Sequence, residues 1–351
     1  MKTLEETYAA IRPPDPEVGR RTQARLDSKT KPPGSLGRLE ELAVRVAAAR
    51  GLEVPELPRK AIVVMAADHG VAAQGVSAFP QEVTAQMVAN FVRGGAAINV
   101  LARLADAEVV VVDMGVKTPI RLPGVLAHWM GPGTCDLSVE PAMTRDGAVA
   151  ALEAGIGLAD DLAGRGVTLV GVGEMGIANT TAASALAACL LGAAPEAMAG
   201  RGTGLDDAAL ARKVGVIRRA LALHAPTSPE PLDALARLGG FEIAGMAGVM
   251  LGAAARRIPV VVDGFISGAA ALAAVRLAPA VSGYLLVGHR SAEPGHRLVV
   301  EALGMPPLLE LGMRLGEGTG AALAMTLVEA AIRIVREMAT FAQAGVSGRG
   351  P

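Results

Sequence analysis

The stretch Ala61-Ile62-Val63-Val64-Met65-Ala66-Ala67-Asp68-His69-Gly70 is a continuous apolar run that ends in a carboxylate, a histidine and a glycine. Apolar residues at every position are typical of a strand whose two faces are both buried in a parallel sheet. Further runs end similarly: 109–112 before Asp113, 168–172 before Gly173-Glu174, 260–262 before Asp263, and 284–287 before Gly288-His289. Amphipathic or alanine-rich segments separate the runs, which predicts an α/β fold with an open parallel sheet and right-handed crossovers.

The polar residues that follow these runs are predicted to meet at one edge of the sheet. Open parallel sheets bind their ligands beyond the carboxyl ends of the strands. The residues expected there are Asp68, Asp113, Glu174, Asp263 and His289. Their convergence indicates a site more strongly than any one of them does alone.

The two ends of the chain have a different texture, polar and helical. Pro32-Pro33-Gly34 predicts a turn, after which Ser35 is expected to cap an amphipathic helix. Another amphipathic helix is expected from about Ala321 to Phe341. Because chain termini often lie close together, we expect the ends to form a small helical domain. The predicted division is 1–58 plus 325–351 for the small domain and 59–324 for the large α/β domain.

The composition argues against nucleic-acid binding and for a core of small side chains. The chain has 351 residues and is 51% hydrophobic but only 2% aromatic, with 43 glycines and a formal net charge of −1. Small aliphatic residues suit helices packed closely on a sheet, and a nearly neutral chain has no basic field to attract nucleic acid. The first residues, Met-Lys-Thr-Leu-Glu-Glu, lack the apolar core of a signal peptide, so we expect a cytoplasmic protein.

Two further features have a structural rather than a functional interpretation. Cys135 and Cys189 have no metal-type spacing and are expected to be buried, free thiols in a reducing compartment. The uncharged segment from Met175 to Pro195 is long enough for a membrane span. It contains polar residues such as Asn179 and Thr180 and follows a glycine-rich loop, so a buried helix is the better interpretation.

The sequence Arg314-Leu315-Gly316-Glu317-Gly318-Thr319-Gly320 places one carboxylate between glycines, just before an apolar helix. Glycine lets the backbone approach a ligand closely, and a helix N-terminus presents free N–H groups to anions. Glu317 is therefore a candidate for proton transfer. The alternative is an acidic residue that only complements the helix dipole; the dipole would lower its pKa, whereas a general base benefits from a raised pKa.

A second candidate loop, Gly171-Val172-Gly173-Glu174-Met175-Gly176, follows a predicted strand and opens a helix. Its glycines partly match a dinucleotide-binding fingerprint, but no ribose-binding acid stands near position 190. A single phosphate at the helix N-terminus fits better, with donors from Asn179, Thr180 and Thr181. The remaining alternative is a glycine-rich turn that binds nothing.

Other candidates are ambiguous when they are read alone. Asp68-His69-Gly70 is either an acid–base or metal pair or a simple strand-end turn, and no second His or Cys stands nearby to complete a metal site. Phe79 either walls a flat apolar ligand or packs on Val83 as a hydrophobic staple. Lys213 is either part of a solvated helix face or a phosphate contact, and Ser291 is a further candidate phosphate contact beyond a strand end.

Several motifs occur in order along the chain: 31–40, KPPGSLGRLE; 67–71, ADHGV; 173–181, GEMGIANTT; 262–265, VDGF; 291–293, SAE; and 314–324, RLGEGTGAALA. Together they closely resemble the nicotinate-nucleotide–dimethylbenzimidazole phosphoribosyltransferase family, from about residue 20 to residue 340. The resemblance implies a homodimer with a Rossmann-like large domain and a small helical domain made from both chain ends. It implies no cofactor and no metal.

The resemblance also implies the reaction. The 5-phosphoribosyl group moves from nicotinate mononucleotide to 5,6-dimethylbenzimidazole with inversion at C1′, giving α-ribazole 5′-phosphate and nicotinate in cobalamin nucleotide-loop assembly. The leaving group is a pyridinium, so its departure neutralises a charge and needs no metal. One base must take the proton from the attacking benzimidazole. By resemblance that base is Glu317, and Glu174 is a second acidic residue that orients substrate or stabilises developing positive charge.

The substrate contacts implied by the resemblance form two groups. The benzimidazole pocket would be lined by Ser77, Phe79, Pro80 and Met87; some relatives have Gln near position 87, so adenine or another benzimidazole stays an alternative base. The nucleotide would be surrounded by Met175, Gly176, Gly202, Lys213, Gly264, Ser291 and Arg314. Gly173, Asn179, Thr180, Asp263 and Leu315 complete the predicted substrate-binding set.

Two other functions fit part of the sequence. An NAD-linked oxidoreductase would use the same sheet edge, but the missing ribose-binding acid disfavours it. A non-catalytic nucleotide-binding or regulatory protein would bind ligand normally after Glu317→Gln and would have no turnover to lose.

Overall fold

The computed structural model describes residues 3–224 and 230–347, so the outermost residues of the predicted small domain, 1–2 and 348–351, lie outside the described residues. Its centre is one sheet of six strands in the order β3-β2-β1-β4-β5-β6, and every neighbouring pair is parallel. The strands are β1 (Lys60–Ala67), β2 (Ala107–Gly115), β3 (Val125–Ala127), β4 (Leu169–Met175), β5 (Val260–Val262) and β6 (Leu285–Val287). The order is the one found in doubly wound sheets, so the predicted α/β class is confirmed.

Five of the six strands coincide with the apolar runs, but β3 was not predicted. Its residues Val125–Ala127 are half-buried or exposed and lie at the edge of the sheet, so no buried apolar run marks them. The predicted strand ends also shift by a few residues. Asp113 and Glu174 lie inside β2 and β4 rather than beyond them.

Alternate residues of β1 belong to two separate cores, one on each face of the sheet. Ala61, Val63 and Met65 pack in the core that includes α6 (Arg145–Gly164), α7 (Asn179–Leu191), α11 (Phe241–Ala255) and α12 (Phe265–Leu277). Ile62 and Val64 pack in the core that includes α4 (Glu82–Arg93), α5 (Ala97–Leu104) and α14 (Thr319–Glu337). Burial on both faces explains why the strand is apolar at every position.

The small side chains of the core allow helices to pack with their backbones almost in contact. A Cβ atom on Gly155 of α6 would overlap the carbonyl of Gly245 in α11, and one on Gly248 would overlap the carbonyl of Leu152. These contacts account for the glycine- and alanine-rich composition. The remaining helices are α1 (Leu4–Ala10), α2 (Pro16–Asp27), α3 (Arg38–Arg50), α8 (Pro195–Met198), α9 (Asp207–His224), α10 (Pro231–Leu238), α13 (Pro294–Leu303) and α15 (Phe341–Ala344).

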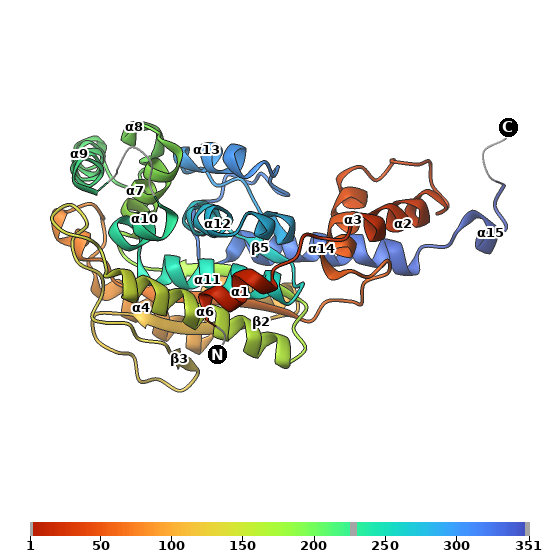
Figure 1. The fold of residues 1–351 in the computed structure, drawn as a ribbon, viewed down its shortest axis with the longest axis horizontal. Helices are drawn as coiled ribbons and strands as arrows, with labels where there is room; N and C mark the ends of the chain where they lie inside the picture. The colour runs from red at the N-terminus through yellow and green to blue at the C-terminus, as the bar shows by residue number, and fades with distance from the viewer. Residues whose placement is uncertain (1–2, 225–229, 348–351) are drawn as a thin grey trace.

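Helices α2 and α3 project away from the sheet with the far end of α14, and we call these three segments the helical arm (Figure 1). The two chain ends meet beside it, where the N–H of Thr30 donates to the carbonyl of Ala339 at 3.1 Å and that of Phe341 donates to Ser28 at 3.1 Å. In contrast, α1 packs on α6 and α11. The division at residues 58 and 325 stays a prediction.

Two details of these helices differ from expectation. Ser35 does not cap α3; the cap residue is Gly37, and the Glu40 side chain reaches back to accept the N–H of Leu36 at 2.9 Å. Helix α14 ends at Glu337, because the Met338 backbone is extended and Thr340 starts α15.

The structure shows where the two cysteines and the uncharged segment from Met175 to Pro195 lie. Both cysteines are free, as expected, but only Cys189 is buried and Cys135 is exposed. Most of the uncharged segment is the buried helix α7, as predicted. No helix among residues 3–224 and 230–347 is long and apolar enough to cross a membrane.

Candidate active site

A cavity of about 680 Å³ lies at the carboxyl edge of the sheet, where the sequence predicts a site. Its volume is within the range of small-molecule sites. It is formed by the ends of β4, β5 and β6, the start of α7 and α12, the loop before α14, and α4. The predicted site residues that line it are Phe79, Met87, Glu174, Met175, Gly176, Asn179, Thr180, Gly202, Asp263, Gly264, Ser291, Arg314, Leu315 and Glu317.

Glu317 is held in an unusual backbone conformation at the cavity wall. It has φ of 62°, between Gly316 at 86° and Gly318 at 87°. Left-handed values are accessible to glycine but are costly for a glutamate, so the conformation requires support from its surroundings. Gly318 packs against Gly173 of β4, and a Cβ on Gly173 would overlap the backbone at Glu317 and Gly318.

The first N–H groups of α14 are already occupied by a side chain. Asp263 accepts hydrogen bonds from the backbone N–H groups of Gly318 at 3.1 Å, Gly320 at 2.6 Å and Ala321 at 3.0 Å. The N-terminus of this helix is therefore capped from β5. It does not offer these groups to a ligand, contrary to the simplest interpretation of the glycine-rich sequence.

The electrostatic environment of Glu317 suits a general base. Burial raises its pKa to about 7, the backbone N–H of Ile98 in the first turn of α5 opposes that rise, and the charge of Asp263 adds to it. Its Oε2 atom is buried and has no hydrogen-bond partner among the described residues. A carboxyl group with a pKa near neutrality and a free oxygen in a cavity can accept a proton.

Glu174 lies beside this loop and is even more strongly perturbed. Burial raises its pKa to about 8; a hydrogen bond from the Asn179 amide opposes the rise, and the charges of Asp263, Glu242 and Glu317 add to it. A Cβ on Gly316 would overlap Oε1 of Glu174, so these two loops meet as closely as their backbones allow. The carboxyl groups of Glu174, near the end of β4, and Glu317, in the loop before α14, thus line the same cavity.

The N-terminus of α7 has no side-chain cap from the described residues, although the N–H groups of Asn179 and Thr181 donate to the carbonyls of Gly176 and Ala178. The first residues of the helix, Asn179 and Thr180, line the cavity. Lys213 lies behind them, fully buried, and its ammonium group donates to Oγ1 of Thr180 at 2.8 Å and to the carbonyl of Gly200 at 3.1 Å. Burial lowers the pKa of Lys213 to about 8, and Glu293 opposes that change. Such a terminus beside an amine suits a phosphate.

The cavity also has apolar lining residues. Phe79 is 53% exposed and Leu315 is 58% exposed, and both line the cavity with Val83 and Met87. The residue before the cap of α4, where a staple would stand, is Pro80 and not Phe79. The geometry therefore favours the ligand-wall interpretation of Phe79 over the staple.

Four predicted site residues do not line the cavity. Ser77 contacts Oγ1 of Thr203 at 3.3 Å, and Pro80 is an exposed residue just before α4. Gly173 packs behind the Glu317 loop, and Lys213 lies behind Thr180. They support the loops that form the cavity, so their roles as direct contacts stay predictions.

The polar residues at the other strand ends have structural partners. Asp113 accepts the N–H groups of Gly115, Val116 and Ile120 within its own loop. Asp68 accepts the N–H of Lys117 at 2.8 Å. In the part of the chain that is described, no three His, Cys, Asp or Glu side chains gather closely enough to hold a metal ion.

Several residues at or behind the cavity were not predicted from the sequence. Glu293 lines it and accepts the N–H of Gly202 at 3.1 Å, while Arg314 donates to the carbonyl of the same residue at 2.8 Å. Glu242, buried in the first turn of α11, binds His69. Glu293 stood within the SAE motif and could have been chosen, whereas no local pattern singles out Glu242.

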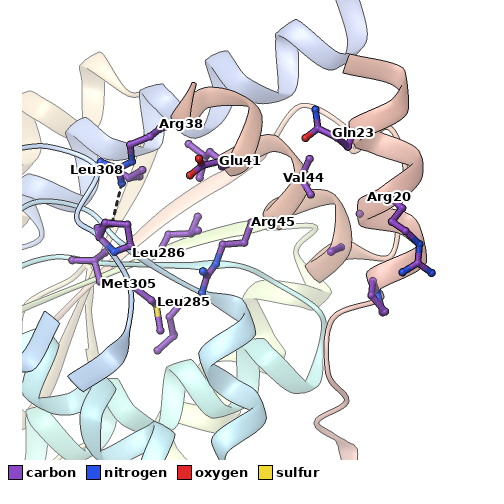
Figure 2. Close-up of a pocket in the computed structure, with 16 residues that line it drawn as sticks. Arg20, Gln23, Arg38, Glu41, Val44, Arg45, Leu285, Leu286, Met305 and Leu308 are labelled. Atoms are coloured by element: carbon purple, nitrogen blue, oxygen red, sulfur yellow. Dashed lines mark hydrogen bonds between the residues drawn. The ribbon is translucent and has the colours of Figure 1, made fainter. Parts of the chain in front are cut away.

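A second cavity, of about 650 Å³, lies between the helical arm and β6 (Figure 2). Leu285, Leu286 and Met305 contribute its apolar side, and Arg38 donates to the carbonyl of Pro306 at 2.9 Å on its rim. None of the predicted site residues is among the described residues that line it. We therefore place the candidate active site in the cavity at the sheet edge.

Comparisons with known proteins agree with the family suggested by the sequence motifs. A family model described as phosphoribosyltransferase matches residues 11–346. The nicotinate-nucleotide–dimethylbenzimidazole phosphoribosyltransferases of Chloroflexus aggregans and of a Roseiflexus species are each 58% identical to this chain, with 99% of both chains covered. The crystal structure of CobT from Thermus thermophilus has a TM-score of 0.92 at 52% identity and covers 95% of this chain and 100% of that one. The chain belongs to this phosphoribosyltransferase family.

Proposed function

We propose that the protein transfers the 5-phosphoribosyl group of nicotinate mononucleotide to 5,6-dimethylbenzimidazole, with inversion at C1′. The observation that carries the proposal is Glu317, a buried carboxyl group with a pKa near 7 and an unpartnered oxygen among the described residues of the cavity. The names of the relatives that cover 99% of the chain support the same reaction. The products are α-ribazole 5′-phosphate and nicotinate, as cobalamin nucleotide-loop assembly requires.

The phosphate of the nucleotide binds at the N-terminus of α7. The support is the absence of a cap among the described side chains, together with the amine of Lys213 behind Thr180. A Cβ on Gly176 would overlap the carbonyl of Ala67, so this turn packs directly on the end of β1, and Gly176 and Ser291 both line the cavity. Helix N-termini and amines are common phosphate ligands.

The attacking base lies against the apolar wall of Phe79, Met87 and Leu315. A flat heterocycle buries area on such side chains without needing a polar partner for each atom. Its position between this wall and Glu317 places one ring nitrogen at C1′ and the other at the carboxylate. Binding the two bases on opposite faces of the ribose accounts for inversion.

The electron and proton movements balance without a further reactant. A lone pair of the benzimidazole nitrogen forms the new bond to C1′ while the old glycosidic bond breaks. The departing electron pair neutralises the pyridinium of nicotinate. The benzimidazole becomes cationic, and Glu317 takes the proton from its other nitrogen. Glu174 has a pKa of about 8; its ionised form stabilises the positive charge that develops near it, and its protonated form orients the substrate.

A direct assay tests the proposal. The protein is mixed with nicotinate mononucleotide and dimethylbenzimidazole, with and without a chelator, and α-ribazole 5′-phosphate is followed by chromatography. Product is expected in both mixtures, since the leaving group needs no metal. Glu317→Gln protein, purified in parallel, controls for a contaminating host enzyme. No product under several conditions would remove the proposal.

We also propose that the active protein is a homodimer that works in the cytoplasm. The dimer follows from the family resemblance, and we propose the projecting helical arm as the contact with the second copy (Figure 1). Sedimentation at micromolar concentration should give twice the chain mass. A concentration-independent monomer with full activity would refute the dimer.

A further inference from the structure

His69 and Glu242 form an ion pair that is completely shielded from solvent. Nε2 of His69 lies 2.7 Å from Oε1 of Glu242, and both side chains are 0% exposed. Burial alone would lower the pKa of His69, but the charge and hydrogen bond of Glu242, together with Asp68, raise it. The surroundings of His69 therefore favour its protonated form. The two side chains are contributed by the end of β1 and the first turn of α11.

The pair lies directly behind the wall of the cavity. A Cβ placed on Gly176 would be 3.4 Å from Cδ2 of the His69 ring, and Gly176 itself lines the cavity. The carbonyl of Gly176 accepts the N–H of Asn179 at 3.1 Å, and the Asn179 amide binds Glu174. The Gly176 backbone therefore lies between the imidazole of His69 and the cavity. The same backbone leads, through one side chain, to the Glu174 carboxyl group.

Packing alone gives little reason to bury two charges here. Replacing a buried ion pair by apolar side chains of similar volume is often neutral or stabilising. Moreover, Nδ1 of His69 and Oε2 of Glu242 are both buried without a partner among residues 3–224 and 230–347. A pair that leaves two polar atoms unpaired contributes less to stability than a fully bonded one.

We propose that His69 and Glu242 are positioning residues for the transfer reaction: the buried pair supports the Gly176–Asn179 turn from behind and, through Asn179, holds the Glu174 side chain in place. The inference rests on the proposed function for its kinetic readout. Glu242 is one of the groups whose charge raises the pKa of Glu174. Glu242 raises the pKa of His69, and protonated His69 limits the influence of Glu242 on Glu174.

Several other groups face this region and stay constant in the test. Asp68 at the end of β1 acts on His69, and Asp263 at the end of β5 acts on Glu174. Glu317, before α14, also acts on Glu174. Nε2 of His289, at the end of β6, lies 3.7 Å from Oδ1 of Asp263.

Substitution of Glu242 and substitution of His69 should shift the pH profile of the reaction in opposite directions. Glu174 has the higher pKa of the two cavity carboxyl groups, about 8 against about 7 for Glu317, so the upper part of the acidic limb of the kcat/KM profile reports its ionisation. Glu242→Gln removes a negative charge near Glu174, so this limb should move to lower pH. His69→Gln keeps a hydrogen-bond donor for Glu242 but removes the cation, so the limb should move to higher pH. Each shift should be about half a pH unit, or about a threefold change at a fixed pH below the limb.

The double variant His69→Gln/Glu242→Gln completes the cycle. Once Glu242 is neutral, His69 loses the main group that raises its pKa and burial favours the neutral imidazole, so adding His69→Gln should leave the limb close to where Glu242→Gln puts it. Asp113→Asn is the matched control for Glu242→Gln, because Asp113 is a buried carboxylate that bonds only its own loop. His224→Gln is the control for His69→Gln, because His224 is also buried but lies at the end of α9. Both controls should leave the limb unmoved.

A second measurement does not depend on turnover. A ¹³C titration of side-chain carboxyl groups in the free protein, with the Glu174 signal identified by Glu174→Gln, should show the same opposite shifts. Lack of turnover by the wild type would then count against the proposed function alone. Shifts in the same direction, or an unmoved Glu174 titration in folded Glu242→Gln protein, would overturn the pairing inference. If His69→Gln does not fold, the titration of Glu174 in the Glu242→Gln variant still tests whether the pair acts on Glu174.

Discussion

At the scale of single residues, the surroundings of Glu317 reconcile two demands that conflict in the sequence. A carboxylate before a helix should have a lowered pKa, whereas a base needs a raised one. In the structure Asp263 caps α14, and burial dominates at Glu317. The backbone N–H that opposes the raised pKa is Ile98 of α5, not a group of α14. The conflict disappears because Asp263, and not Glu317, accepts the first N–H groups of α14.

Glu317→Gln should lower kcat by about 10²–10⁴-fold and leave KM for both substrates within a few-fold, since it removes proton transfer but keeps the shape. Steady-state kinetics at saturating base measure both values. Glu310→Gln, an exposed carboxylate a few residues earlier, is the matched control and should behave as wild type. Full activity of Glu317→Gln would mean that another group takes the proton.

Gly316→Ala should abolish most of the activity, because its Cβ would overlap Oε1 of Glu174. Gly312→Ala separates this effect from backbone strain: Gly312 also has a left-handed φ, of 66°, but nothing described lies within 4 Å of its Cβ position. Each variant should lose about 1 kcal/mol of unfolding free energy from strain. Only Gly316→Ala should also lose turnover. Equal activities of the two folded variants would show that the Gly316–Glu174 contact is unimportant.

Residue-level prediction worked where a local pattern exists. The Gly316-Glu317-Gly318 sequence and the strand-end acids marked Glu317, Glu174 and Asp263, all of which line the cavity. Their predicted roles remain to be tested by the variants above. Glu242 could not be found, because its significance comes from His69, 173 positions away in the sequence.

At the scale of elements, the helix N-termini around the cavity differ in what occupies them. Helix α14 is capped by Asp263, whereas α7 and α12 have no cap from a described side chain. Lys213 lies behind α7, which makes α7 the better anion site of the two open ends. The sequence shows glycines before all three helices and so cannot distinguish them.

Lys213→Met should raise KM for nicotinate mononucleotide at least about tenfold with little change in KM for the benzimidazole, since a buried cation near a phosphate contributes strongly to binding. Arg212→Met is the matched control: it is the neighbouring residue on α9 but is exposed. The measurement is KM for each substrate in turn. An equal loss for both substrates would indicate damage to the fold rather than a lost phosphate contact.

Elements were predicted well when burial imposes a pattern and poorly when it does not. The buried strands stand out as apolar runs, but β3 is exposed at the sheet edge and carries no such signal. The cap of α3 was misassigned because the helix begins only at Arg38, after Gly37, and the Glu40 side chain binds the N–H of Leu36 ahead of it. Caps depend on which side chain reaches the helix end, and sequence spacing alone does not decide that.

At the scale of the whole molecule, the raised pKa of Glu174 links stability to pH. Its folded value of about 8 lies above the ordinary 4.5, so its contribution to stability is full below about pH 4.5 and is lost as pH rises through about 8. Glutamine cannot ionise. The melting temperature of Glu174→Gln should therefore gain a few degrees relative to wild type between about pH 5 and about pH 8.5.

Thermal unfolding across this pH range measures the difference between the two proteins. Glu310→Gln should show a constant difference from wild type, because its side chain is exposed. A constant difference for Glu174→Gln as well would show that Glu174 titrates as an ordinary carboxylate in the free protein.

The overall architecture was the most predictable level. Five buried runs with intervening helices leave few topologies for a parallel sheet, and the observed order follows the common one. The placement of the arm was less predictable, since α1 packs on α6 and α11 although it adjoins the arm in sequence. The distribution of apolar residues on α1 does not say which partner it covers.

Helix α14 begins two residues after Glu317 and continues beyond the sheet into the helical arm. Its 19 residues make a nearly rigid rod of about 28 Å, at 1.5 Å per residue. If α14 tilted about its contact with the sheet, its two ends would move by different amounts. A tilt of about ten degrees would move the far end by about 5 Å while the cavity end barely shifts. Most of any such movement would therefore occur far from Glu317, and the backbone next to the reactive carboxylate would keep its place.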